Sequence, residues 1–133
     1  MSPGPSRPSD RGSAAVEFAL VLPLVLVLAL AVLQVGLFLK DQLVLVGAAR
    51  AGAREAAVSP ADEDARAAAL RASVGLDQEA IEVSVRREGG IGTAVEVTVR
   101  YQAPVVVPLV RWLFQEVVTL AATATMRQET EEG

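Results

Sequence analysis

The chain has 133 residues and a formal net charge of −4 at pH 7, and it contains neither cysteine nor histidine. This composition excludes disulfides, thiolate nucleophiles, Cys/His zinc sites and His-based catalytic triads. The acidic balance, without any cluster of Lys and Arg, argues against a nucleic-acid partner. A chain of this length has room for one membrane helix and one small domain.

The first twelve residues are rich in Pro, Ser and Gly and carry almost no apolar side chains, so residues 1–12 are predicted to form a disordered leader. The two arginines of this leader outnumber its one aspartate, whereas Lys40 and Asp41 cancel each other beyond the apolar segment that follows. The positive-inside rule therefore predicts a cytoplasmic N-terminus and a body on the outer side of a bacterial cytoplasmic membrane.

An uncharged stretch runs from Phe18 to Leu39, with Gln34 as its one strongly polar side chain. At about 1.5 Å per residue a helix of this length measures about 33 Å, enough to cross a hydrocarbon core of about 30 Å. The sequence therefore predicts a single membrane-spanning segment at about residues 18–39, with membrane lipid as a partner. A signal peptide cleaved near Ala29–Ala31 is the less favoured alternative, because apolar residues continue on both sides of that site.

The carboxylate of Glu17 stands at the start of this apolar stretch, where a charge is expensive unless it is paired. One interpretation is that Glu17 complements the dipole at the beginning of the helix. The other is that cleavage after Gly12 frees an amino group on Ser13, and that Glu17 then pairs with the corresponding amine of a neighbouring subunit.

Residues Arg11–Pro23, RGSAAVEFALVLP, resemble the class III signal of type IV pilins and pseudopilins. They are most similar to the TadE-like pilus assembly proteins of tight-adherence systems. The segment Ala48–Glu55, AARAGARE, extends the resemblance, which covers roughly the first third of the chain from Arg11 to Glu55.

The resemblance implies specific roles for several residues. It implies that a prepilin peptidase cuts after Gly12, that Ser13 becomes the new N-terminus and that Glu17 guides subunit registration. Phe18 stands where major pilins of these systems commonly have tyrosine, which favours a minor pseudopilin. Pro23 lies inside the helix, where it removes a backbone hydrogen bond and is expected to cause a kink or a locally loosened turn. Membrane helices tolerate proline in general, and the resemblance favours its use as a flexible point when a subunit leaves the bilayer.

The function implied by the resemblance is that of a pseudopilin-like component of tight-adherence (Flp-type) pilus assembly or secretion machinery. Its partners would be other pilin-like subunits, pilus assembly platform proteins and the prepilin peptidase, with no cofactor. The alternative is a single-pass envelope protein whose outer domain binds an unrelated envelope partner without any pilus role. No catalytic constellation is recognisable in the sequence.

The helix is predicted to continue over residues 13–58, because nothing interrupts it before Ser59 and Pro60. In its last third, small residues recur four apart, including Gly47 with Ala51 and Ala48 with Gly52. Such spacing lets a sheet or a neighbouring subunit approach the backbone closely, although the general richness of the chain in alanine explains it equally well.

Residues 59–133 are predicted to form a small extracytoplasmic α+β domain with an acidic tail. A second helix is expected from Ser59 to Gly75, with Ser59 as its cap, Pro60 in its first turn and three acidic residues near its start.

Alternating apolar residues predict three antiparallel strands, at Glu79–Glu88, Thr93–Gln102 and Val117–Met126, with Gly89–Gly92 as the first turn. The connection Ala103–Glu116 is unusually apolar. Either Val110, Leu113 and Phe114 fill the core, or Arg111, Trp112 and Phe114 lie at the membrane interface or a partner surface. The predicted fold is thus α+β and pilin-like, a long N-terminal transmembrane helix followed by a short helix and a three-stranded antiparallel sheet.

Overall fold

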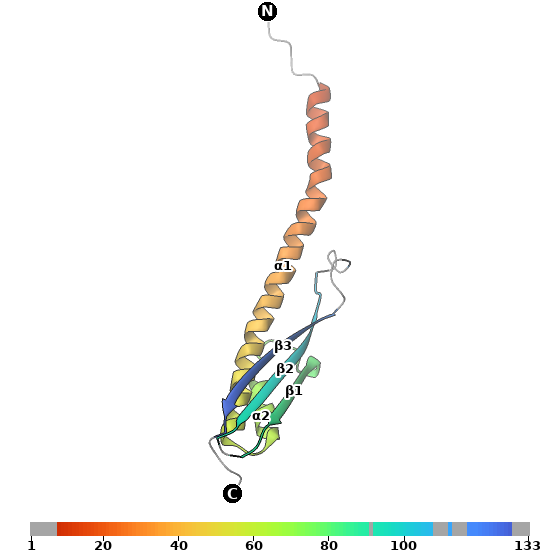
Figure 1. Ribbon diagram of the computed structural model, residues 1–133. Coiled ribbons are helices and arrows are strands. Elements are labelled where there is room, and N and C mark those ends of the chain that lie inside the picture. Colours follow the sequence, from red (N-terminus) through yellow and green to blue (C-terminus); the bar gives the residue numbers. More distant parts are fainter. Residues whose placement is uncertain (1–7, 91, 108–111, 113–116, 129–133) are drawn as a thin grey trace, which may run out of the picture.

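A computed structural model of the chain describes residues 8–90, 92–107, 112 and 117–128. The elements follow in the order α1 (Pro8–Val58), α2 (Asp62–Ala72), a 3-10 turn η1 (Gln78–Ala80), β1 (Ile81–Arg87), β2 (Ala94–Pro104) and β3 (Val117–Arg127). α1 extends far beyond a small body made of the other elements (Figure 1). The α+β class and the predicted order of long helix, short helix and three-stranded antiparallel sheet are confirmed.

The long helix begins earlier than expected. α1 starts at Pro8, so residues 8–12 of the predicted disordered leader are helical, whereas residues 1–7 lie outside the described part of the chain. Proline is well suited to a first helical turn because its missing N–H would have no partner there. The helix also continues without interruption through Pro23, and its axis bends only gently in this region (Figure 1).

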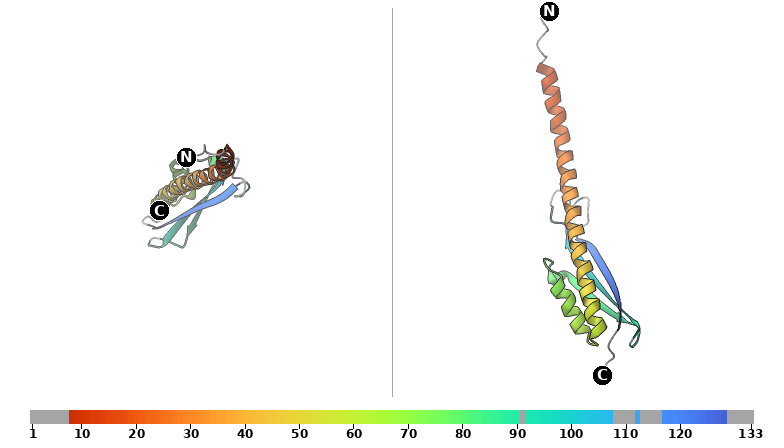
Figure 2. Two further views of the ribbon diagram at one scale, coloured as in Figure 1. Left: turned by 90° about the horizontal axis from the view of Figure 1, so that it is seen from above. Right: turned by 90° about the vertical axis from the view of Figure 1, so that its left-hand side faces the viewer.

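The two halves of α1 have different surroundings. Residues 11–26 are exposed on every side, while the second half packs against α2, β2 and β3. α1 and α2 lie side by side on one face of the sheet, and α2 also contacts β1 (Figure 2). The body is therefore a two-layer arrangement that holds only the C-terminal half of the long helix.

The core of this body is built largely from small side chains of the helices and valines of β2. The buried residues of this part of α1 are Leu45 and a set of small residues, Ala48, Ala49, Gly52, Ala53, Ala56 and Ala57. They meet Ala65 and Ala69 of α2 and Val95, Val97 and Val99 of β2. Because most of these helical side chains are short, the backbones approach each other closely on this face.

Gly52 and Gly47 differ sharply in their environments. A Cβ added at Gly52 would lie 2.9 Å from Val97 Cγ1, 3.2 Å from Ala69 Cβ and 3.3 Å from the Ala65 carbonyl oxygen. Gly47 is exposed, and a Cβ there would meet nothing within 4 Å. Ala51 is half-buried. Of the two glycines among these predicted packing residues, Gly52 therefore packs closely within the body and Gly47 does not.

The second helix is shorter than predicted. α2 begins at Asp62 after Ala61, and Ser59 lies outside it rather than at its cap. The Ser59 hydroxyl instead donates to Asp64 Oδ2 at 2.6 Å and accepts from the Ala61 amide at 3.3 Å. The helix ends at Ala72, and Gly75 then adopts a positive φ of 82°, a turn conformation that glycine enters without steric cost.

The sheet has the strand order β1-β2-β3, and both pairings are antiparallel. Alternate residues such as Val83, Val99 and Ala122 share register positions and face the helices, as the period-two pattern predicted. The opposite face is polar: Glu82 lies across from Arg100, and the Thr98 and Thr123 hydroxyls hydrogen-bond at 3.0 Å. This face suits contact with water, because oppositely charged neighbours across strands are favourable.

Arg87 connects several elements at the end of the body where α1 ends. Its guanidinium donates to Asp62 Oδ1, to the Ala56 and Ser59 carbonyls at 2.9 Å, and to Gln128 Oε1 at 3.1 Å. Two of these acceptors are carbonyls at the C-terminal end of α1, where backbone acceptors lack helical partners and a cation is favourable. A single side chain of β1 therefore connects both helices and the end of β3.

Replacing Arg87 by methionine is expected to lower the free energy of unfolding of the body by about 2–3 kcal/mol, since several hydrogen bonds to a charged donor are lost together. Hydrogen–deuterium exchange of the full chain in detergent micelles measures this as faster exchange in β1 and β3. Arg86→Met is the matched control, because Arg86 is exposed on the polar face, and its effect should stay within about 0.5 kcal/mol. Equal effects of the two variants would contradict the role given to Arg87.

Leucine substitutions at the two glycines should differ in their effects on stability. Gly52→Leu is expected to destabilise the body by at least about 1–3 kcal/mol, because the side chain would displace Val97 and Ala69. Gly47→Leu should leave stability unchanged or raise it by up to about 1 kcal/mol, since leucine is the better helix former. Urea titrations followed by hydrogen–deuterium exchange of β2 compare the two, and a tolerated Gly52→Leu would refute the close packing.

Candidate functional site

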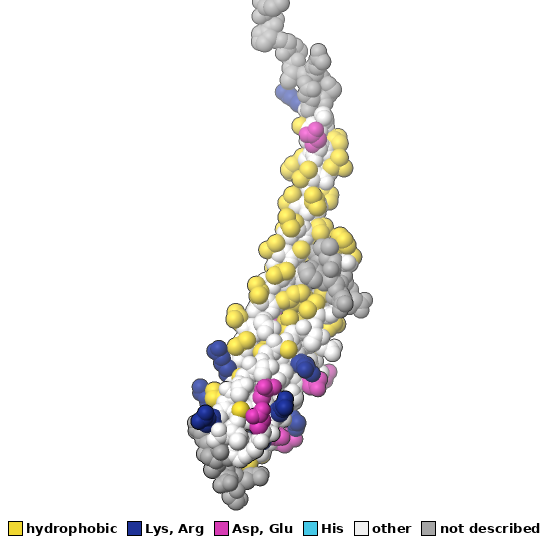
Figure 3. Space-filling view, viewed as in Figure 1, with side chains coloured by type: hydrophobic (Ala, Val, Ile, Leu, Met, Phe, Trp, Pro, Cys, Tyr) yellow, Lys and Arg dark blue, Asp and Glu magenta, His cyan; other side chains and the backbone are white. Residues whose placement is uncertain are grey.

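The N-terminal half of α1 presents a continuous apolar surface. Phe18, Leu20 and Leu24 are about two-thirds to three-quarters exposed, and other large apolar side chains surround them on the helix (Figure 3). In the part of the chain that the structure describes, α1 is the one helix long and apolar enough to cross a membrane. Soluble monomers rarely expose so much apolar surface in one patch, and single-pass membrane anchoring is the function that this surface indicates.

The residues of the predicted processing and registration site all lie on the exposed helix. A Cβ at Gly12 would meet nothing within 4 Å, and Ser13, Glu17 and Phe18 are all exposed. Ser13 and Glu17 are four residues apart and so share one face of the helix. Among the described residues no ion pair involves Glu17. The fold brings no second element to these residues, and their roles in cleavage and registration stay predictions.

Gln34 is the polar residue inside the apolar stretch, and the structure buries it almost completely, with 1% of its surface exposed. Its side-chain Oε1 accepts hydrogen bonds from the backbone amides of Val106 at 3.0 Å and Val107 at 3.2 Å. The sequence marked Gln34 as unusual but gave no partner for it. The partner comes from more than seventy residues further on, so that only the fold reveals it.

The chain after β2 continues along α1 rather than turning away from it. Val105 and Val107 are buried in a second small cluster with Val27, Leu30 and Ala31 of the helix. These helical residues belong to the stretch predicted to cross the membrane. The chain after β2 therefore lies beside the predicted membrane-spanning part of α1.

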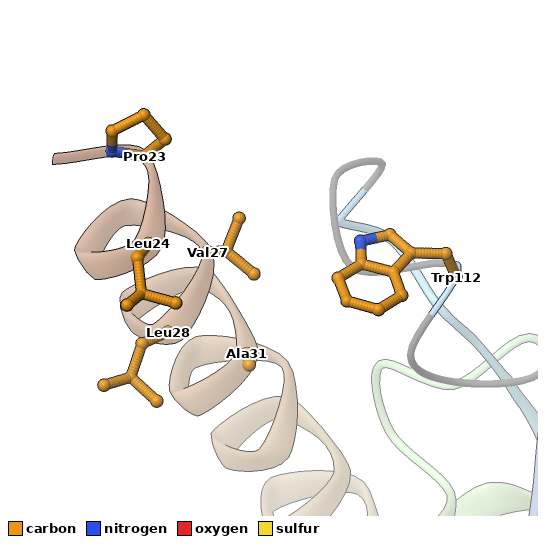
Figure 4. Close-up of a pocket in the computed structure, with 6 residues that line it drawn as sticks. All are labelled: Pro23, Leu24, Val27, Leu28, Ala31 and Trp112. Atoms are coloured by element: carbon orange, nitrogen blue, oxygen red, sulfur yellow. The ribbon is translucent and has the colours of Figure 1, made fainter. Parts of the chain in front are cut away.

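Trp112 lies further along, beside the helix, and its surface is 74% exposed. It forms one wall of an apolar groove whose other walls are Pro23, Leu24, Val27, Leu28 and Ala31 (Figure 4). Trp112 is therefore exposed, as the surface interpretation expects of it. Arg111, Val110, Leu113 and Phe114 lie outside the described residues.

Within the described residues, no group of three or more His, Cys, Asp or Glu side chains could hold a metal ion. The recognisable features of the described residues are instead the bare apolar helix, a carboxylate near its start and a groove beside it.

Comparison with protein families gives a match to the family described as TadE-like protein, over residues 12–54. No curated protein and no solved structure matches the chain. The matched residues run from the predicted cleavage site to the buried end of α1, which confirms the resemblance predicted from the sequence. Residues 12–54 are thus similar to TadE-like proteins, and this similarity suggests a role in the Tad/Flp pilus system.

Proposed function

We propose that the protein is a pseudopilin-like component of the tight-adherence pilus assembly or secretion machinery, held in the cytoplasmic membrane by one helix. The observation that carries the proposal is the division of α1: one unbroken helix has a bare apolar half that includes the TadE-like N-terminal residues, and a half packed into a small body. We infer a structural and assembling role rather than a catalytic one.

In this proposal α1 is a rigid connection between the membrane and the body on its outer side. The helix has no break between its two halves, and its second half is fixed by close contacts at Gly52. A movement of the membrane half along its axis would therefore carry the body with it. Such a rigid connection suits a subunit that is drawn out of, or packed against, other subunits in the bilayer.

Glu17 supplies the proposed contact between subunits. A carboxylate inside the edge of the hydrocarbon costs free energy, and the translocon scale gives about 2.5–3.5 kcal/mol for an acidic residue at a helix centre. Its exposure on α1 leaves it available to a neighbour. Pairing with the free amine of a neighbouring Ser13 would neutralise both charges and would fix the axial register of the two helices.

The proposed cleavage between Gly12 and Ser13 falls in the second turn of α1, which starts at Pro8. Terminal helical turns open at little free-energy cost, so a membrane peptidase could bind this segment in an extended form. We propose the N-terminus on the cytoplasmic side, on the basis of the excess of positive charge in residues 1–12.

The intact mass and N-terminal sequence of the protein extracted from membranes of its native host test processing. We expect a chain that starts at Ser13, and Gly12→Leu should yield only the unprocessed chain because the bulky side chain would block the peptidase. A native protein that retains Met1 would contradict cleavage and would leave the alternative of a permanently anchored envelope protein.

Glu17→Gln should leave membrane insertion intact, since it removes a charge from the apolar segment, but should reduce co-purification with other pilin-like subunits at least tenfold. Glu79→Gln is the matched control, because Glu79 is an exposed carboxylate of η1 in the outer body. Crosslinking in native membranes followed by mass spectrometry measures both. Unchanged association of the Glu17 variant would rule out the charge pairing.

A further inference from the structure

We propose that Val105–Val107 and Trp112 form a second membrane-embedded part of the protein, in which the indole of Trp112 lies among lipid acyl chains beside α1. The proposal rests on the membrane anchoring described above. It adds to that function a contact between the β2–β3 connection and the lipid itself.

The first argument is position along the helix. Trp112 faces α1 between Pro23 and Ala31, inside the stretch without charged side chains that ends at Leu39. Val27 stands ten residues beyond Glu17, about 15 Å at 1.5 Å per residue, which is half of a hydrocarbon core of about 30 Å. With Glu17 at the edge of the hydrocarbon, the level of Trp112 falls well inside the bilayer.

The second argument concerns the backbone hydrogen bonds of the segment that follows β2. Irregular backbone at membrane depth is tolerated only where its polar groups are satisfied by protein or water. The segment from Pro104 to residue 108 reads PVVVP, so two of its five positions have no amide hydrogen. Of the three amides that remain, those of Val106 and Val107 donate to the buried Gln34. Two of the three remaining donors are therefore satisfied by protein, as an apolar solvent requires.

The third argument is the chemistry of the groove between Trp112 and α1. It has a volume of about 380 Å³, and every side chain that lines it is apolar (Figure 4). It opens onto the bare surface of the membrane helix, where acyl chains are the surrounding solvent. A lipid chain is therefore the occupant that both the lining and the location favour.

A second hollow, nearer the body, lies where we place the change from hydrocarbon to water. It is lined by apolar and polar residues together, among them Gln34, Lys40, Asp41 and Tyr101. The adjacent Lys40 and Asp41 are the first charged groups after Glu17. The boundary between hydrocarbon and water thus lies between the level of Trp112 and that of Lys40.

The experiment uses the fluorescence of the full chain in lipid vesicles, because Trp112 is the one tryptophan of the protein. Phosphatidylcholine brominated either deep on the acyl chains or near the headgroups serves as quencher. We expect deep bromines to remove most of the Trp112 emission, headgroup labels to remove less, and aqueous iodide to remove little. Stronger quenching by headgroup labels or by iodide than by deep bromines would overturn the proposal.

Two relocated tryptophans make the result independent of the anchoring itself. Trp112→Phe/Val25→Trp places the indole on the bare helix outside the groove, where Val25 is 52% exposed, and should be quenched by deep bromines. Trp112→Phe/Ser84→Trp places it on the polar face of β1 and should respond only to iodide. If the helix reporter is quenched and native Trp112 is not, this inference fails while the anchor stands; if neither is quenched, the anchoring fails as well.

Discussion

The rest of the structure depends on the close packing of one face of α1, made largely of small side chains, against the sheet. Gly52 lies so close to Val97 and Ala69 that even a methyl group would collide with them. Close backbone approach lets one helix serve both as the core of a small body and as a long projecting rod. The body after the helix is small and would bury little apolar area alone, so it relies on α1 for its core.

Two hydrogen-bonded clusters hold this packing at opposite ends. Arg87 and Gln128 join α1, α2, β1 and β3 at the far end, where carbonyls at the end of the helix need donors. Gln34 holds the chain after β2 at the membrane end by accepting two amides. In each case a long polar side chain satisfies backbone groups that secondary structure leaves unpaired, and so fixes the connections as well as the elements.

The character of the surface changes along the long axis of the molecule, from apolar on the bare helix to polar on the outer face of the sheet. From Phe18 onward the bare half of α1 is apolar on all sides, whereas the outer face of the sheet pairs Glu82 with Arg100 and Thr98 with Thr123. A helix that is apolar all round is unfavourable in water, and a charged sheet face is unfavourable in lipid. The TadE-like residues fall on the apolar rod and at its junction with the body, so the rod is the part that the family likeness covers.

The sequence by itself determined the elements whose signals are local: the apolar helix, the antiparallel strands with their turn, and the TadE-like residues near Gly12 and Glu17. Helix starts were less well predicted. α1 begins at Pro8 rather than at residue 13, and α2 begins at Asp62 because the Ser59 hydroxyl bonds to Asp64 and Ala61 instead of capping the helix. Tertiary structure alone decided which small residues pack, since Gly47 and Gly52 have the same chemistry but lie on different faces. It also decided the partner of Gln34 and the place of Trp112, because both contacts join segments that only the folded sheet brings alongside the helix.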